Sequence, residues 1–206
     1  MNKLKLLATT GALAVTVTLA GCGSSGGGHD MGSMSSPSMS SASASSSSGT
    51  PAAGAHNDAD VMFAQMMIPH HRQAIEMADM ILAKQGIDSE VTALATEIKG
   101  AQTPEIDQMT GWLTGWGQSA TPSTSMGHDM GGTMSQADMD ALDKATGQDA
   151  AKLFLTGMIT HHKGAIDMAK NELANGQNPD TKKLAQSIAD SQQVEIDKMN
   201  EMLKKY

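Results

Sequence analysis

Two pairs of adjacent histidines are the residues of this chain best suited to chemistry. The first pair is His70 and His71, and the second is His161 and His162, 91 positions later (161 − 70 = 91). Each pair is preceded by a methionine three or four positions back and followed by a short charged and apolar segment that is similar in both places. Imidazole and thioether groups at this spacing can bind the same soft metal ion.

The segments around the histidines are copies of one another. Residues 63–78 are identical to residues 154–169 at nine of sixteen positions, and residues 94–109 are identical to residues 184–199 at eight of sixteen. The chain is therefore a tandem duplication, and each copy contains imidazoles, thioethers and carboxylates.

Helices are the elements that must position these groups. The apolar residues recur at helical spacing and no sustained alternation typical of strands occurs, so we expect an all-α fold. Glycines at 86 and 176 separate the helices of each copy by only a few residues, which predicts two helical hairpins in a four-helix bundle. The long helices are expected at about 57–85, 88–113, 149–174 and 178–206, with a short helix that opens at Ser135 and breaks at Gly147. Pro69 is expected to kink the first of them.

The predicted helix faces bring polar groups toward the core. At about 100° per residue, His70 and His161 fall in the apolar stripe of their helices, with His71 and His162 at its edge. Glu105 and its counterpart Glu195 fall at the centre of the stripes of the partner helices. A buried carboxylate is costly unless it is paired or bound to a metal, so two readings arise. Either each glutamate pairs with the histidine of its own hairpin, or these groups and nearby methionines surround a metal ion.

The donor types favour copper. Thioether with imidazole selects copper, Cu(I) above all with Cu(II) also possible, whereas zinc sites prefer cysteine and a di-iron site uses Glu-x-x-His motifs that do not occur here. The expected metal ligands or supporting groups are His70, His71, Met67, Met77, Glu105, Met109, His161, His162, Met158, Met168, Glu195 and Met199.

The composition of residues 1–56 indicates an export signal followed by a spacer. Residues 1–21 combine a basic start with a short apolar run, and they end before Cys22 in a box that resembles a bacterial lipoprotein cleavage site, which implies lipidation of Cys22. Residues 22–56 are rich in serine and glycine and are expected to be a disordered tether. The duplicated domain then spans 57–206, with repeats at 58–114 and 149–205 and a flexible linker at 115–134.

Both low-complexity segments contain a His-Asp-Met triplet. We expect flexible metal capture by His29, Met31, Met126, His128 and Met130. The formal charge of −8 excludes a phosphate-binding surface and suits a cation, so no nucleic-acid partner is expected.

The two histidine segments, 67–78 and 158–169, resemble the signature of the domain-of-unknown-function 305 family. The resemblance covers about 58–206 and implies a ferritin-like helical bundle, an extracytoplasmic location and a copper role. It does not imply catalysis. Thr160 stands where the signature usually has proline, so the two halves are expected to be unequal. The resulting hypothesis is a membrane-anchored, extracytoplasmic protein that sequesters copper. The alternatives are a ferritin-like metal oxidase and an envelope scaffold that binds no metal.

Overall fold

The computed structural model describes residues 54–121 and 131–206. The expected signal segment, Cys22 and the tether up to residue 53 lie outside the described residues, as do the capture residues His29, Met31, Met126, His128 and Met130.

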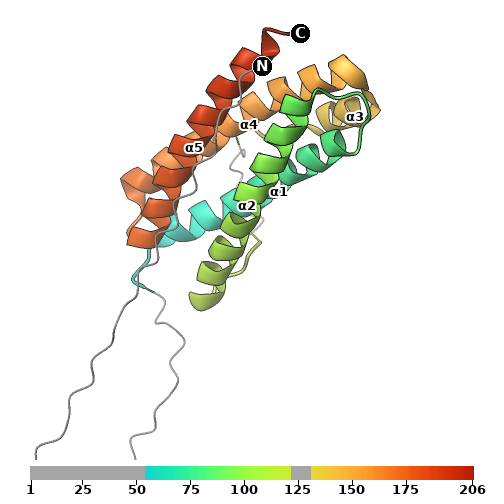
Figure 1. The fold of residues 1–206 in the computed structure, drawn as a ribbon. Helices are drawn as coiled ribbons and strands as arrows, with labels where there is room; N and C mark the ends of the chain where they lie inside the picture. Colours follow the sequence, from blue (N-terminus) through green and yellow to red (C-terminus); the bar gives the residue numbers. More distant parts are fainter. Residues whose placement is uncertain (1–53, 122–130) are drawn as a thin grey trace, which may run out of the picture. The chain divides into compact units, whose positions relative to one another are not determined.

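The described residues form five helices and no strand, so the all-α prediction is confirmed (Figure 1). The helices are α1 (Asp58–Leu82), α2 (Ser89–Gly115), α3 (Gln136–Lys144), α4 (Gly147–Asn175) and α5 (Pro179–Leu203).

Short polar side chains begin these helices. The Asn57 side chain accepts from the backbone N–H groups of Ala59 and Asp60 at 3.0 and 3.1 Å. Asn178 caps α5 in the same way ahead of Pro179, and Asp88 caps α2. Each cap satisfies backbone donors that have no partner inside the helix, which fixes where the helix starts. These starts agree with the predicted ones.

The end of α1 differs from the prediction. The helix α1 ends at Leu82 rather than at residue 85, because Gly86 adopts a positive φ of 74° and the chain turns before it. Pro69 lies inside α1, which continues through it from Asp58 to Leu82, and Pro104 lies inside α2 in the same manner.

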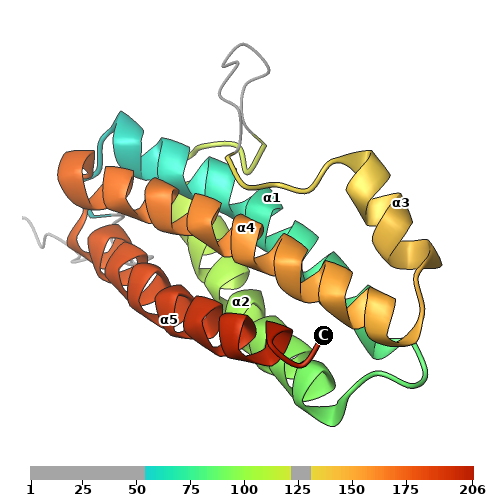
Figure 2. The same cartoon turned by 90° about the horizontal axis from the view of Figure 1, so that it is seen from above.

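The long helices form two antiparallel hairpins, α1–α2 and α4–α5. The hairpins meet mainly through α1 and α4, which lie side by side, and α3 packs on the outside of α4 (Figure 2). Within the described residues, no helix is both long and apolar enough to cross a membrane.

A polar layer divides the core into two apolar clusters. One cluster joins the C-terminal half of α1 to the N-terminal half of α4, around Met77, Phe154 and Met158. The other joins the opposite halves, around Phe63 and Met67. Between them lie six buried polar side chains: His70, His71, Gln102, His161, His162 and Gln192. The duplicated histidines therefore lie at mid-height in the bundle.

Candidate metal centre

The inner histidine pair, His70 and His161, joins the two hairpins. Both side chains are fully buried, and their ring centroids lie 3.6 Å apart with a 39° angle between the ring planes. His70 comes from α1 and His161 from the equivalent position of α4. The candidate site is thus shared between the hairpins, a point that the sequence leaves open.

Burial keeps the inner pair neutral. Burial and the neighbouring His71 and His162 lower the pKa of His70 to about 3, against an opposing contact with the Gly131 backbone. Burial, together with the other three histidines, places the pKa of His161 well below its usual value. A neutral imidazole has a free lone pair, which is the form that binds a metal.

The outer pair, His71 and His162, is bonded to carboxylates. His71 Nε2 lies 2.7 Å from Glu105 Oε2, and His162 Nε2 lies 2.6 Å from Glu195 Oε2. Each glutamate therefore pairs with a histidine of its own hairpin. The prediction that Glu105 and Glu195 lie at the centre of the apolar stripes of their helices is wrong, because their side chains are 18% and 19% exposed.

Gln102 and Gln192 occupy the central positions instead. They are 2% and 3% exposed, and they are equivalent residues of the two repeats. The sequence contained a signal for them, since this glutamine is one of the positions conserved between the two copies of the second block. It lies only 60° from Glu105 around the helix, an angle too small for a helical projection to resolve.

The polar layer concentrates unpaired atoms. In the described part of the chain, both ring nitrogens of His70 and His161 and the Nδ1 atoms of His71 and His162 have no hydrogen-bond partner. The side-chain amide of Gln102 and the Gln192 Oε1 are also unpaired. Leaving such an atom buried and unpaired costs about 1–3 kcal/mol each. A bound species that accepts these lone pairs or forms hydrogen bonds with these atoms would offset that unfavourable free energy.

The predicted methionines are distributed around this layer. Met67 and Met109 lie in one apolar cluster, and Met77, Met158 and Met199 in the other, all fully buried. Met168 is only partly buried. Across residues 54–121 and 131–206, no three His, Cys, Asp or Glu side chains come close enough together to bind one ion. A metal bound at the inner pair would therefore need thioether donors, and those fit a soft cation.

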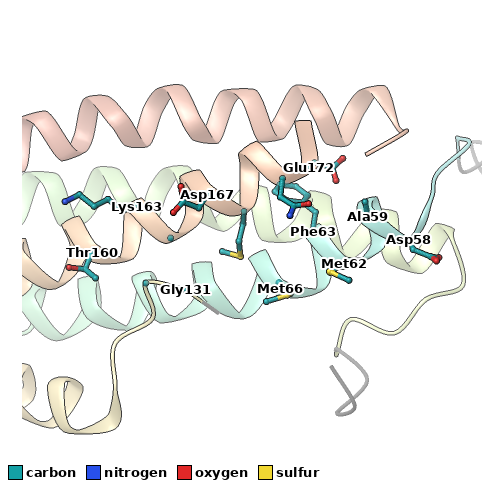
Figure 3. A pocket seen from close by; sticks show the side chains of 14 residues that line it. Asp58, Ala59, Met62, Phe63, Met66, Gly131, Thr160, Lys163, Asp167 and Glu172 are labelled. Atoms are coloured by element: carbon teal, nitrogen blue, oxygen red, sulfur yellow. The ribbon is translucent and has the colours of Figure 1, made fainter. Parts of the chain in front are cut away.

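A groove of about 680 Å³ runs along α1 and α4 beside the polar layer. Figure 3 shows Met62 and Met66 on its α1 side and Asp167 and Glu172 on its α4 side. Met168 also lines it. The groove combines thioethers with carboxylates, so it offers soft donors in an acidic setting.

A buried carboxyl cluster closes one end of the bundle. Asp60 Oδ1 accepts from the Asn178 backbone N–H at 2.8 Å, and the Thr181 Oγ1 lies 2.7 Å from both Asp60 and Glu172. Burial alone would raise the pKa of Asp60, but bonds from Thr181, Asn57 and Asn178 outweigh it and lower the pKa to about 2. Burial, reinforced by Asp60, raises the pKa of Glu172 to about 7. The sequence reading missed this cluster because its members are far apart in the chain.

Comparison with known proteins places these features in a family. The family model of DUF305, a domain of unknown function, matches residues 60–203. A comparison with curated proteins found no match.

Several solved structures share the fold. A DUF305 protein from Streptomyces coelicolor, described as secreted, is 34% identical with a TM-score of 0.68, over 71% of this chain and 93% of that one. A DUF305 fragment from Deinococcus radiodurans is 32% identical with a TM-score of 0.66, over 73% and 98%. CopM in its Cu(I)-bound form is 34% identical with a TM-score of 0.60, over 71% and 96%. Cu(II)-bound, Ag-bound and apo forms of CopM match similarly.

Proposed function

The chain belongs to the DUF305 family, and from that premise we propose that it binds copper between its two helical hairpins, for sequestration outside the cytoplasm. The similarity to CopM, whose structures include Cu(I)-, Cu(II)- and Ag-bound forms, supports a copper-related role. The observation that carries the proposal is the inner pair. Two neutral, fully buried imidazoles face each other across the hairpins, and none of their four nitrogens has a hydrogen-bond partner among the described residues.

In this proposal the inner and outer histidines have different roles. His70 and His161 supply the inner imidazole nitrogens, and His71 and His162 are further imidazole candidates. Glu105 and Glu195, which are bonded to His71 and His162, balance the charge of the ion. Thioethers complete the site, and the candidates are Met67, Met77, Met109, Met158, Met168 and Met199. Such a donor set favours Cu(I) over Cu(II).

The location is part of the proposal. The described secretion of the Streptomyces coelicolor relative supports an extracytoplasmic site of action. Lipidation at Cys22 after removal of residues 1–21 would anchor the protein to a membrane, with His29, Met31, Met126, His128 and Met130 as additional capture groups. Mass spectrometry of the membrane fraction tests this anchor, since an unmodified N-terminus would contradict it.

The test of copper binding is competition with a chromophoric Cu(I) chelator. We expect the wild type to withdraw Cu(I) from the chelator, and His70→Ala/His161→Ala to bind at least about a hundredfold more weakly, because both nitrogen donors are gone. His56→Ala is the matched control, since His56 stacks on Trp116 at 4.4 Å, away from the polar layer. Equal affinity of the double variant and the wild type would contradict the proposal.

The two alternatives give different outcomes. A scaffold without a metal would show an unchanged melting temperature on adding copper, whereas a ligand of the folded state must raise it. An oxidase would turn over when the protein is loaded anaerobically and then exposed to air. We propose no catalytic role, because Glu105 and Glu195 each bond a histidine of their own hairpin rather than converging on a shared position.

A further inference from the structure

The chain between the hairpins lies tightly against the bundle at residues 131–134, which we call the strap. Gln73 of α1 holds its end through two hydrogen bonds. The Gln73 Nε2 donates to the Met134 carbonyl at 3.0 Å, and the Met134 N–H donates to Gln73 Oε1 at 2.8 Å. A side-chain amide that pairs both ways with one residue's backbone fixes the position of that residue.

Glycines let the strap approach α4 at close range. A Cβ at Gly164 would overlap the Gly131 carbonyl oxygen. A Cβ at Gly132, which has a φ of 86°, would lie 2.6 Å from the Thr160 carbonyl oxygen. The backbones therefore touch where any side chain would separate them. The strap is held by α1 on one side and by α4 on the other.

A third glycine makes room for the Met134 side chain. A Cβ at Gly157 would overlap the Met134 Sδ, and it would lie 3.2 Å from the Met77 Cε. The thioethers of Met134 and Met77 therefore share the space over Gly157. Met77 is fully buried and Met134 is partly buried against the same cluster.

The inner histidine of α4, His161, comes one helical turn after Gly157. His161 lies four residues after Gly157, and long side chains on a helix lean over the turn that precedes them. The His161 ring is fully buried, and neither of its nitrogens has a partner among the described residues. By this rule the His161 imidazole is directed toward the space over Gly157 that the thioethers of Met134 and Met77 share.

We propose that Met134 is a ligand, and that it forms with Met77 and His161 a binding site for a soft monovalent cation, Cu(I) or Ag(I), over Gly157. The inference rests on the proposed copper function and adds a donor from outside the helical repeats. Two sulfurs and one nitrogen suit Cu(I) and Ag(I), and they discriminate against Cu(II) and harder divalent ions. Gln73 acts as a positioning residue for the Met134 sulfur.

The test compares sulfur removal with sulfur displacement in the full chain. Met134→Leu keeps an apolar side chain and deletes the sulfur, while Gly157→Ala keeps every donor and places a Cβ where the sulfur lies. Met139→Leu is the control, because Met139 is a buried methionine of α3. The measurements are Cu(I) affinity by chelator competition and the sulfur-to-nitrogen ratio from X-ray absorption at the copper edge, with circular dichroism to check folding.

We expect Met134→Leu and Gly157→Ala to weaken Cu(I) binding by at least about tenfold and to lower the sulfur count, while Met139→Leu changes neither. Unchanged affinity and sulfur count in Met134→Leu would overturn the assignment of Met134 alone, provided that His161→Ala still weakens binding. If Gly157→Ala binds as tightly as wild type, the sulfur does not act from this position. Failure of the wild type itself to bind Cu(I) would instead remove the proposed function.

Discussion

The two repeats bury equivalent histidines, His70 and His161. The two sides of their contact along α1 and α4, which we call flanks, differ. On one flank, Gly157 of the second repeat admits the Met134 side chain of the strap. On the other flank, the first repeat has Met66 at the equivalent position, and the groove beside Met66, which Gly164 and the strap glycines also line, stays open. The repeats therefore diverge where the strap lies, and one flank is closed while the other is accessible.

The thioethers follow the same division. Met77 and Met168 are equivalent residues of the two repeats, yet Met77 is fully buried beside Met134 and Met168 lines the open groove with Met66. Each flank thus has a pair of thioethers, Met77 with Met134 on one and Met66 with Met168 on the other. The difference teaches that a duplicated unit can bury a thioether on one flank and leave its equivalent in an open groove on the other.

The backbone contact between the strap and α4 should be sensitive to added volume. We expect Gly164→Ala to lower the free energy of unfolding by about 2–3 kcal/mol, because the new Cβ would force the strap backbone away from α4. Gly111→Ala is the control, since a Cβ there meets nothing within 4 Å, and it should stabilise α2 by about 0.5–1 kcal/mol. Urea unfolding measures both. Stabilisation by Gly164→Ala would mean that the strap backbone does not lie against α4.

The end of the open groove should respond to pH. Glu172 lines it, whereas the equivalent residue of the other repeat is the buried Ile81. The pKa of Glu172 is raised to about 7, so its proton stabilises the fold fully below pH 4.5, and this contribution is lost as the pH rises through 7. Glu172→Gln removes the titration. We therefore expect the variant to gain about 1–2 kcal/mol relative to wild type between pH 4.5 and 8.

The measurement is the difference in unfolding free energy between the two proteins at each pH. Titration of His70 and His161 also changes stability in this range, with the opposite sign, but it is common to both proteins and cancels in the difference. A difference that stays constant from pH 4.5 to 8 would show that Glu172 is ionised throughout.

The smallest effect on Cu(I) affinity is expected from removing the sulfur of Met66, which lines the open groove. Met66→Leu should change the affinity of the tightest Cu(I) site by less than about threefold, because the closed flank keeps its donors. The same chelator competition that tests Met134 measures it. A loss as large as that of Met134→Leu would mean that the two flanks are equivalent and that the strap adds nothing.

Much of the fold could be predicted from the sequence, because its determinants are local. Four helices begin at a side chain that bonds the next few backbone amides, and such bonds depend on adjacent residues only. The capping residues are Asn57, Asp88, Ser135 and Asn178. The sequence duplication then predicted that the long helices form two similar hairpins.

The site could be predicted only in part. The burial of His70 and His161 follows from helical spacing, but their contact depends on how two hairpins pack, which no single helix face encodes. The strap was missed for the same reason. In the sequence, Gly157 and Gly164 are simply helix residues and Met134 is a linker residue. Only the packed structure shows that the two segments are in contact.

The contact of His70 with His161 has a consequence for symmetry. A residue that touches its own repeat counterpart lies near the axis that relates the two repeats, so the copper site proposed at the His70–His161 contact would lie close to an internal pseudo-twofold axis. This is the arrangement of a homodimer in which each subunit donates the same imidazole. Joining the two halves in one chain makes the local concentration of the second imidazole independent of the protein concentration, and it allows the two flanks of the axis to evolve separately.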